Sequence, residues 1–180
     1  MGVNIDKVLI TRQEIEDMVT RLGAEITNDN KGRKVLLVCV LKGAFIFLAD
    51  LVRHIDLPLE VDFMSVSSYG NNTDTSGVVR ILRDLDTDIT GKHVIIVEDI
   101  IDSGLTLRHL KELLSTRNPA SISICTAFDK PDRRKAEVKV DYRGMIIPDE
   151  FVVGYGLDFA GDYRHLPDVC ILSDDGGDKE

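Results

Sequence analysis

The chain has 180 residues and a formal net charge of −9, from 31 acidic and 22 basic side chains. This length is typical of a single domain that buries about 70% of its unfolded surface without disulfides or structural metals. The acidic balance argues against a general DNA- or RNA-binding protein, and the sequence shows neither a signal peptide nor an apolar stretch long enough to span a membrane.

Three cysteines, Cys39, Cys125 and Cys170, each lie inside a short apolar run. Such settings predict buried free thiols in strands and a reducing, cytoplasmic location. We expect one domain over residues 1–180, with a flexible acidic tail over 174–180.

Apolar residues alternate along the chain between helical spacing and short buried runs. The first helix is the clearest, because Thr11 and Glu14 form a capping box in front of it. In chain order, helices are predicted over 12–27, 44–55 and 103–116, and strands over 35–41, 59–67, 78–82, 94–97, 121–128, 138–147, 151–154 and 168–172.

This order predicts an α/β fold, an open and mostly parallel twisted sheet flanked by helices. The N-terminal helix and the C-terminal strands are candidates for a small covering lobe, or hood. Ligands of such sheets bind at the carboxyl ends of the strands. Lys42, Glu98, Asp99 and Lys130 are all expected just after a strand, so they predict one composite site there.

The most informative segment follows the β-branched run Val94–Val97. Two adjacent carboxylates, Glu98 and Asp99, come next, and residues 102–106 then open a helix with small hydroxylated side chains. Helix N-termini attract phosphate, and carboxylates beside a phosphate need a cation or hydroxyl groups between them. A sugar phosphate presented with magnesium satisfies both requirements.

Each motif also has a simpler interpretation. Capping of a helix would explain Asp102 and Ser103, although it leaves Glu98 and Asp99 unexplained. Lys42-Gly43 alone is typical of a turn, the 130–134 segment of a solvated loop, and Phe151 of a core residue. The polar segment 69–77 alone favours a solvated hairpin loop over a lid.

Residues 97–106 match, in register, the phosphoribosyl-pyrophosphate signature of the type I phosphoribosyltransferases, which the chain resembles. Further segments narrow the resemblance to the hypoxanthine-guanine branch of that family: Leu41-Lys42-Gly43, Ser68-Tyr69, Asp129-Lys130-Pro131 and Phe151 to Asp158, followed by Arg164. Together they extend over roughly residues 5–173. The resemblance implies the type I phosphoribosyltransferase fold and transfer of 5-phosphoribosyl from phosphoribosyl pyrophosphate to N9 of hypoxanthine or guanine.

The resemblance also assigns roles to individual residues. Asp102 would be the catalytic acid/base at N7 of the purine. The ribose and its 5-phosphate would be bound by Glu98, Asp99, Asp102, Ser103, Gly104, Leu105 and Thr106. Pyrophosphate would be bound by Lys42, Gly43 and Arg164, with a cis peptide at Leu41-Lys42. The purine would contact Lys130, Phe151, Val152 and Asp158, Mg²⁺ would be held by Glu98, Asp99 and Asp158, and Ser68 and Tyr69 would belong to a lid.

Two residues bear on specificity. Lys130 is a hydrogen-bond donor that favours a 6-oxopurine over a 6-aminopurine. Leu105 carries no charge, unlike the lysine of some relatives, so the phosphate anchor should consist of backbone and hydroxyl groups.

Two alternative functions are a relative that prefers xanthine and an RNA-binding regulator of the same fold. The expected partners are the two substrates and further copies of the chain in a homodimer or homotetramer. No nucleic acid and no membrane are expected.

Overall fold

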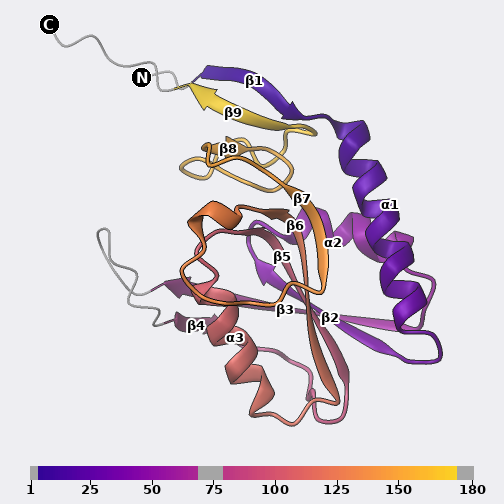
Figure 1. The fold of residues 1–180 in the computed structure, drawn as a ribbon. Coiled ribbons are helices and arrows are strands. Elements are labelled where there is room, and N and C mark those ends of the chain that lie inside the picture. The colour runs from indigo at the N-terminus through magenta and orange to yellow at the C-terminus, as the bar shows by residue number, and fades with distance from the viewer. Residues whose placement is uncertain (1–3, 69–78, 174–180) are drawn as a thin grey trace, which may run out of the picture.

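The computed structural model describes residues 4–68 and 79–173, so Tyr69, most of the predicted lid and the tail over 174–180 lie outside the described residues. Its main sheet has the strand order β4-β3-β2-β5-β6-β7 (Figure 1). These strands are β2 (Val35–Leu41), β3 (Leu59–Ser68), β4 (Val79–Arg83), β5 (His93–Ile101), β6 (Ser121–Asp129) and β7 (Tyr142–Ile146). Neighbouring strands of this sheet run parallel except for β3 and β4, as predicted.

A second, three-stranded antiparallel sheet forms the hood (Figure 1). Its strands are β1 (Asn4–Ile10), β9 (Val169–Ser173) and β8 (Val152–Val153). The predicted C-terminal strands are present, but the N-terminal contribution is strand β1 and not the helix that follows it. The sequence did not reveal β1 because its ladder with β9 is interrupted twice, between Ile5 and Lys7 and between Val8 and Ile10, which breaks the period-2 pattern.

Alternate residues of the central strands face two separate cores. Leu37 and Ile95 pack with helices α1 (Arg12–Asp29) and α2 (Phe45–Leu51), whereas Leu36 and Ile96 pack with helix α3 (Leu105–Ser115). Figure 1 shows α1 and α3 on opposite sides of the sheet. The N-terminal helix therefore covers the main sheet and does not belong to the hood.

All three helices differ from their predicted bounds: α1 runs two residues further, to Asp29, and α3 spans Leu105–Ser115 within the predicted 103–116. The helix predicted over 44–55 ends at Leu51 and continues as a single 3-10 turn, η1 (Val52–His54). A second 3-10 turn, η2 (Pro131–Arg133), follows β6. The three cysteines are buried in β2, β6 and β9 and carry free thiols, as predicted. Among the described residues, no helix combines the length and apolarity needed to cross a membrane.

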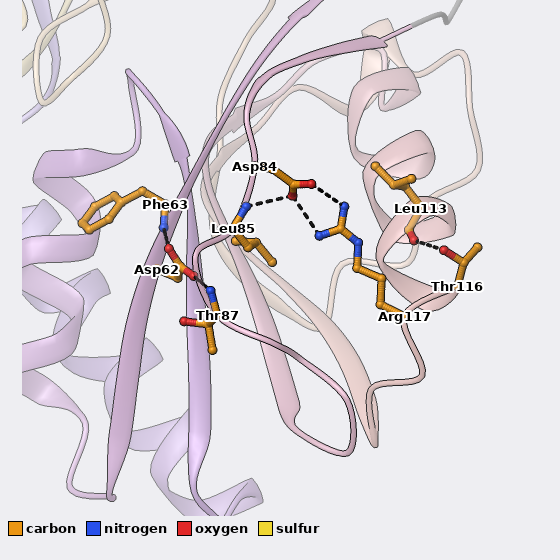
Figure 2. A network of polar contacts seen from close by, with 8 residues as sticks. All are labelled: Asp62, Phe63, Asp84, Leu85, Thr87, Leu113, Thr116 and Arg117. Atoms are coloured by element: carbon orange, nitrogen blue, oxygen red, sulfur yellow. Dashed lines mark hydrogen bonds and ion pairs between the residues drawn. The ribbon is translucent and has the colours of Figure 1, made fainter.

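Two carboxylates fasten the loop that follows β4 (Figure 2). Asp62 on β3 accepts hydrogen bonds from the N–H groups of Phe63 at 2.7 Å and Thr87 at 2.8 Å. Asp84 accepts one from Leu85 N–H and pairs with both terminal guanidinium nitrogens of Arg117, all at 2.8 Å. The loop is thereby tied to β3 on one side and to the end of α3 on the other.

Candidate active site

Glu98 and Asp99 lie inside β5, and not after its end as predicted. The pairing of β5 with β2 stops at Val97, opposite Cys39, whereas its pairing with β6 continues to Ile101. From Glu98 onward, one edge of β5 is therefore released from the sheet. This opening at the carboxyl edge makes room for two charged side chains in a strand that is otherwise buried.

The two carboxylates share a confined space. Desolvation, followed by the nearby Asp99 charge, raises the pKa of Glu98 well above its usual range. Asp99 accepts a hydrogen bond from Ile100 N–H at 2.8 Å, and a Cβ atom on Gly43 would overlap the Asp99 carboxylate. Glycine at position 43 therefore lets the acid pair approach the turn that follows β2.

The turn before α3 presents backbone N–H groups. Gly104 is the N-cap residue, in the left-handed region with φ of 78°, and the cap has no side-chain hydrogen bond. Gly104, and neither Asp102 nor Ser103, therefore takes the N-cap position, although Ser103 Oγ accepts a hydrogen bond from Leu105 N–H at 3.4 Å. The first intrahelical bond joins Arg108 N–H to Gly104 O at 3.0 Å. Of the N–H groups before it, that of Leu105 donates to Ser103 Oγ, and the others at this helix start are oriented to meet an anion.

A cavity of about 370 Å³ joins the acid pair, this turn and the hood. It is lined by most of the residues predicted to bind phosphoribosyl pyrophosphate and Mg²⁺, namely Lys42, Gly43, Glu98, Asp99, Asp102, Ser103, Gly104, Thr106, Asp158 and Arg164. The predicted residue Leu105 does not line it, and its backbone N–H donates to Ser103 Oγ at 3.4 Å. The apolar wall of Val66, Ile100 and Ile101 was not predicted, because apolar strand residues look like core residues in a sequence.

The hood supplies the far wall of this cavity. Asp158 pairs with Arg164 at 2.7 Å, and its other oxygen accepts from Gly161 N–H at 2.8 Å. Arg164 also donates to Gly156 O at 2.6 Å. Gly156, with φ of 97°, packs so closely on Gly43 O that a Cβ atom would overlap it. The Leu41-Lys42 peptide bond beside this contact is cis, as the resemblance implies.

Asp102 is held from one side and free on the other. Its Oδ2 lies 3.4 Å from Arg133 Nη1, whereas its Oδ1 is buried and has no hydrogen-bond partner among the described residues. Arg133 also pairs with Asp149 at 2.5 Å, and these two carboxylates raise the pKa of Arg133, Asp102 having the larger effect. The sequence did not predict the bridging role of Arg133, because the pattern around it favours a solvated loop.

Of the predicted purine residues, Asp158 lines this cavity, whereas Lys130, Phe151 and Val152 do not. Lys130 is 7% exposed; its backbone N–H donates to Ile101 O at 2.9 Å, and its Nζ donates to Glu150 O at 2.7 Å. Phe151 is 55% exposed and meets Phe159 edge-to-face, with ring centroids 5.7 Å apart, while Val152 is buried in β8. Lys130 thus links the cavity wall to the segment that carries an exposed aromatic ring.

The donor atoms of the acid pair fit magnesium. Hard carboxylate oxygens are its preferred protein ligands, and Mg²⁺ usually takes only one or two of them and completes its shell with water and phosphate. The described residues contain no cluster of three or more possible metal ligands. Asp158 fits less well than the acid pair, because Arg164 and Gly161 N–H already engage both of its oxygens.

The mostly parallel sheet, the turn before α3, the acid pair and the hood together define the class, and the phosphoribosyl transferase domain family matches residues 9–160. The chain belongs to this family. It is 54% identical over 172 residues to hypoxanthine-guanine phosphoribosyltransferase of Bacillus subtilis, covering 96% of both chains. It is 53% identical to hypoxanthine phosphoribosyltransferase of Salmonella typhimurium, covering 91% of this chain and 93% of that one.

A solved structure agrees with these relatives. The crystal structure of a hypoxanthine-guanine phosphoribosyltransferase from Bacillus anthracis matches with a TM-score of 0.92 at 47% identity, covering 94% of this chain and 100% of that chain. The predicted fold class is confirmed.

Proposed function

We propose that this chain transfers 5-phosphoribosyl from phosphoribosyl pyrophosphate to N9 of hypoxanthine or guanine, giving IMP or GMP and pyrophosphate in purine salvage. The observation that carries the proposal is Asp102, whose unpartnered buried oxygen lies between a phosphate-binding turn and the Lys130 segment. Relatives named for this activity, about half identical over nearly the whole chain, support it.

The donor occupies the cavity at the carboxyl edge of the sheet. Its 5-phosphate binds the N–H groups at the start of α3 and the hydroxyls of Ser103 and Thr106. Lys42 and Arg164 neutralise the pyrophosphate as it leaves. All of these residues line the cavity.

Magnesium is the proposed cofactor, and Glu98 and Asp99 would hold it together with the ribose hydroxyls. When bound, it would neutralise charge on the pyrophosphate that this acidic chain does not neutralise by itself. Asp158 is proposed as a ligand of a second ion, which would compete with Arg164 for the Asp158 carboxylate.

The acceptor base binds next to Asp102. Lys130 donates to O6, since its ammonium group has three donors and only one is accounted for by Glu150 O. Phe151 stacks on the purine, and the Val152 backbone contacts its pyrimidine edge. Asp102 Oδ1 accepts the N7 proton as the bond from N9 to the ribose forms.

Residues 68–77 are proposed as a lid, because a ribose with oxocarbenium character would be hydrolysed if water reached it. Protection of the backbone amides of this segment on adding a substrate analogue with Mg²⁺ would support the lid. Unchanged exchange rates would count against it.

The experiment is turnover with phosphoribosyl pyrophosphate and Mg²⁺ against hypoxanthine, guanine, xanthine and adenine. We expect product from hypoxanthine or guanine and at most a trace from adenine. Xanthine as the best substrate would change the base assignment. If no base gave turnover and the chain shifted the mobility of RNA at physiological salt, the function would be assigned to an RNA-binding regulator and not to an enzyme.

We also propose a cytoplasmic location and a homodimer or homotetramer. The free thiols of Cys39, Cys125 and Cys170 suit a reducing compartment. Exposed Phe45 on α2 and Val61 on β3 offer apolar area to a second copy. Light scattering of the purified chain would give its oligomeric state, and a monomer would contradict the proposal.

A further inference from the structure

An ion-pair cluster around one buried carboxylate lies outside the cavity, at the end of β6, where Arg134 is mostly buried and Arg143 is half-exposed. Asp129, which is fully buried, accepts a hydrogen bond from Arg134 Nη2 on one oxygen. Its other oxygen lies 2.9 Å from Arg143 Nε in an ion pair that is not aligned as a hydrogen bond. One carboxylate and two guanidinium groups leave a net positive charge. Since buried ion pairs add little stability compared with apolar side chains of equal volume, we looked for another use of this charge.

Arg134 packs directly on the phosphate-binding turn. A Cβ atom built on Gly104 would lie 3.0 Å from Arg134 Cδ and 3.4 Å from Arg134 Nη1. Behind the same turn, Ser103 O accepts hydrogen bonds from the N–H groups of Lys135 at 2.9 Å and Ala136 at 3.0 Å. The turn that presents N–H groups to the cavity therefore rests on residues 134–136.

The charge of Arg134 suits an anion on the other side of the turn. Its Nη1 is buried and has no hydrogen-bond partner within the described part of the chain. A cation at a helix N-terminus is unfavourable in the empty protein, because the helix dipole is also positive there, but it becomes favourable once a phosphate binds. Leu105 gives the turn no charged side chain of its own.

We propose that Arg134 is a positioning residue of the 5-phosphate subsite. Fixed by Asp129, it supports the Gly104 backbone from behind and places a positive charge under the turn. This inference rests on the proposed function, since the anion that it serves is the phosphate of the ribosyl donor.

The chain offers a matched control in Arg143, which pairs with the same Asp129 carboxylate but is not among the nearest neighbours of Gly104. In Arg134→Gln we expect the KM for phosphoribosyl pyrophosphate and the Kd for ribose 5-phosphate to rise about tenfold, while the KM for hypoxanthine changes less than about twofold. Arg134→Lys, which keeps the charge, should recover part of the loss, and Arg143→Gln should leave both constants near wild type.

Thermal unfolding separates a positioning role from a structural one. The proposal is overturned if Arg134→Gln and Arg143→Gln raise the KM for phosphoribosyl pyrophosphate and the Kd for ribose 5-phosphate equally, in proportion to the fall in melting temperature. If Arg134→Gln does not fold, the double variant Asp129→Asn, Arg134→Gln removes both partners and is compared in the same way. If the wild type showed no turnover, the proposed function would be refuted. If turnover were normal and Arg134→Gln left the KM for phosphoribosyl pyrophosphate and the Kd for ribose 5-phosphate unchanged, only this inference would be refuted.

Discussion

Two groups of carboxylates in the same sheet have opposite surroundings. Asp62 on β3 is 4% exposed and receives two backbone N–H groups (Figure 2). These bonds lower its pKa even though burial alone would raise it. On β5, burial and a like charge raise the pKa of Glu98, and Asp102 just beyond keeps a buried oxygen without a partner. The first kind is satisfied by its own chain, whereas the second kind includes a buried oxygen, Asp102 Oδ1, that the described residues leave without a partner.

The largest predicted effect removes the free carboxylate oxygen. Asp102→Asn should lower kcat by about 10³-fold, because an amide is not a base for the N7 proton. The melting temperature should stay near that of the wild type, since Arg133 keeps its second partner, Asp149. Steady-state kinetics and calorimetry test both, with exposed Asp132→Asn as the control. A kcat loss below tenfold would remove Asp102 from proton transfer.

The next effect concerns the acceptor. Lys130→Ala should lower kcat/KM for hypoxanthine by about 10²-fold or more, because the 6-oxo group loses its donor. The KM for phosphoribosyl pyrophosphate should change only a few-fold. Exposed Lys139, which pairs with Asp141 on the surface, provides the control Lys139→Ala. An unchanged specificity constant for hypoxanthine in Lys130→Ala would contradict the assignment.

A satisfied carboxylate should show the reverse pattern. Asp62→Asn places an amide N–H group against a backbone N–H group, so we expect the free energy of unfolding to fall by about 2 kcal/mol. The value of kcat should stay within about twofold. Urea unfolding measures the first quantity, and Asp86→Asn, at an exposed surface pair with Arg83, should cost less than about 0.5 kcal/mol. If Asp62→Asn lowered kcat but left the free energy of unfolding unchanged, Asp62 would behave like the site carboxylates, and the distinction between the two groups would fail.

The smallest effect is a pH dependence. Arg117 lowers the pKa of Asp84, and backbone hydrogen bonds lower that of Asp62. A lowered pKa stabilises the fold above the unfolded value of about 4, and this stability is lost as pH falls through the folded values. The thermal unfolding midpoint should therefore fall as the pH is lowered below about 4.

The variant Arg117→Gln isolates the surface part of this dependence. Both side chains of the Asp84–Arg117 pair are about a third or more exposed, so the variant should cost less than about 1 kcal/mol at pH 7. The difference from wild type should vanish in acid, where Asp84 is protonated in both proteins. A difference that persists unchanged at pH 2.5 would show that the effect is not electrostatic.

The sequence predicted the central sheet because the alternate apolar residues of Val35–Leu41 and their neighbours specify two buried faces. It also predicted Glu98 and Asp99 as site residues, since charge is unusual in a buried strand. It did not predict that β5 continues past them, because the end of the strand depends on where β2 stops pairing. The contacts of Arg133 and Arg134 likewise depend on folding, which brings the 130–136 segment back to residues 102–104.

The contact between Gly43 and Gly156 has a geometric consequence. Two backbones meet there without side chains, at the point where the hood touches the turn after β2. The thickness of the wall between the two lobes is therefore set by the main chain alone. An alanine at position 156 would push the hood outward by about the width of a methyl group, and Asp158 and Arg164 would move with it. The spacing between the hood and this turn thus depends on the missing Cβ atom of Gly156, and the missing Cβ atom of Gly43 leaves room for the Asp99 carboxylate.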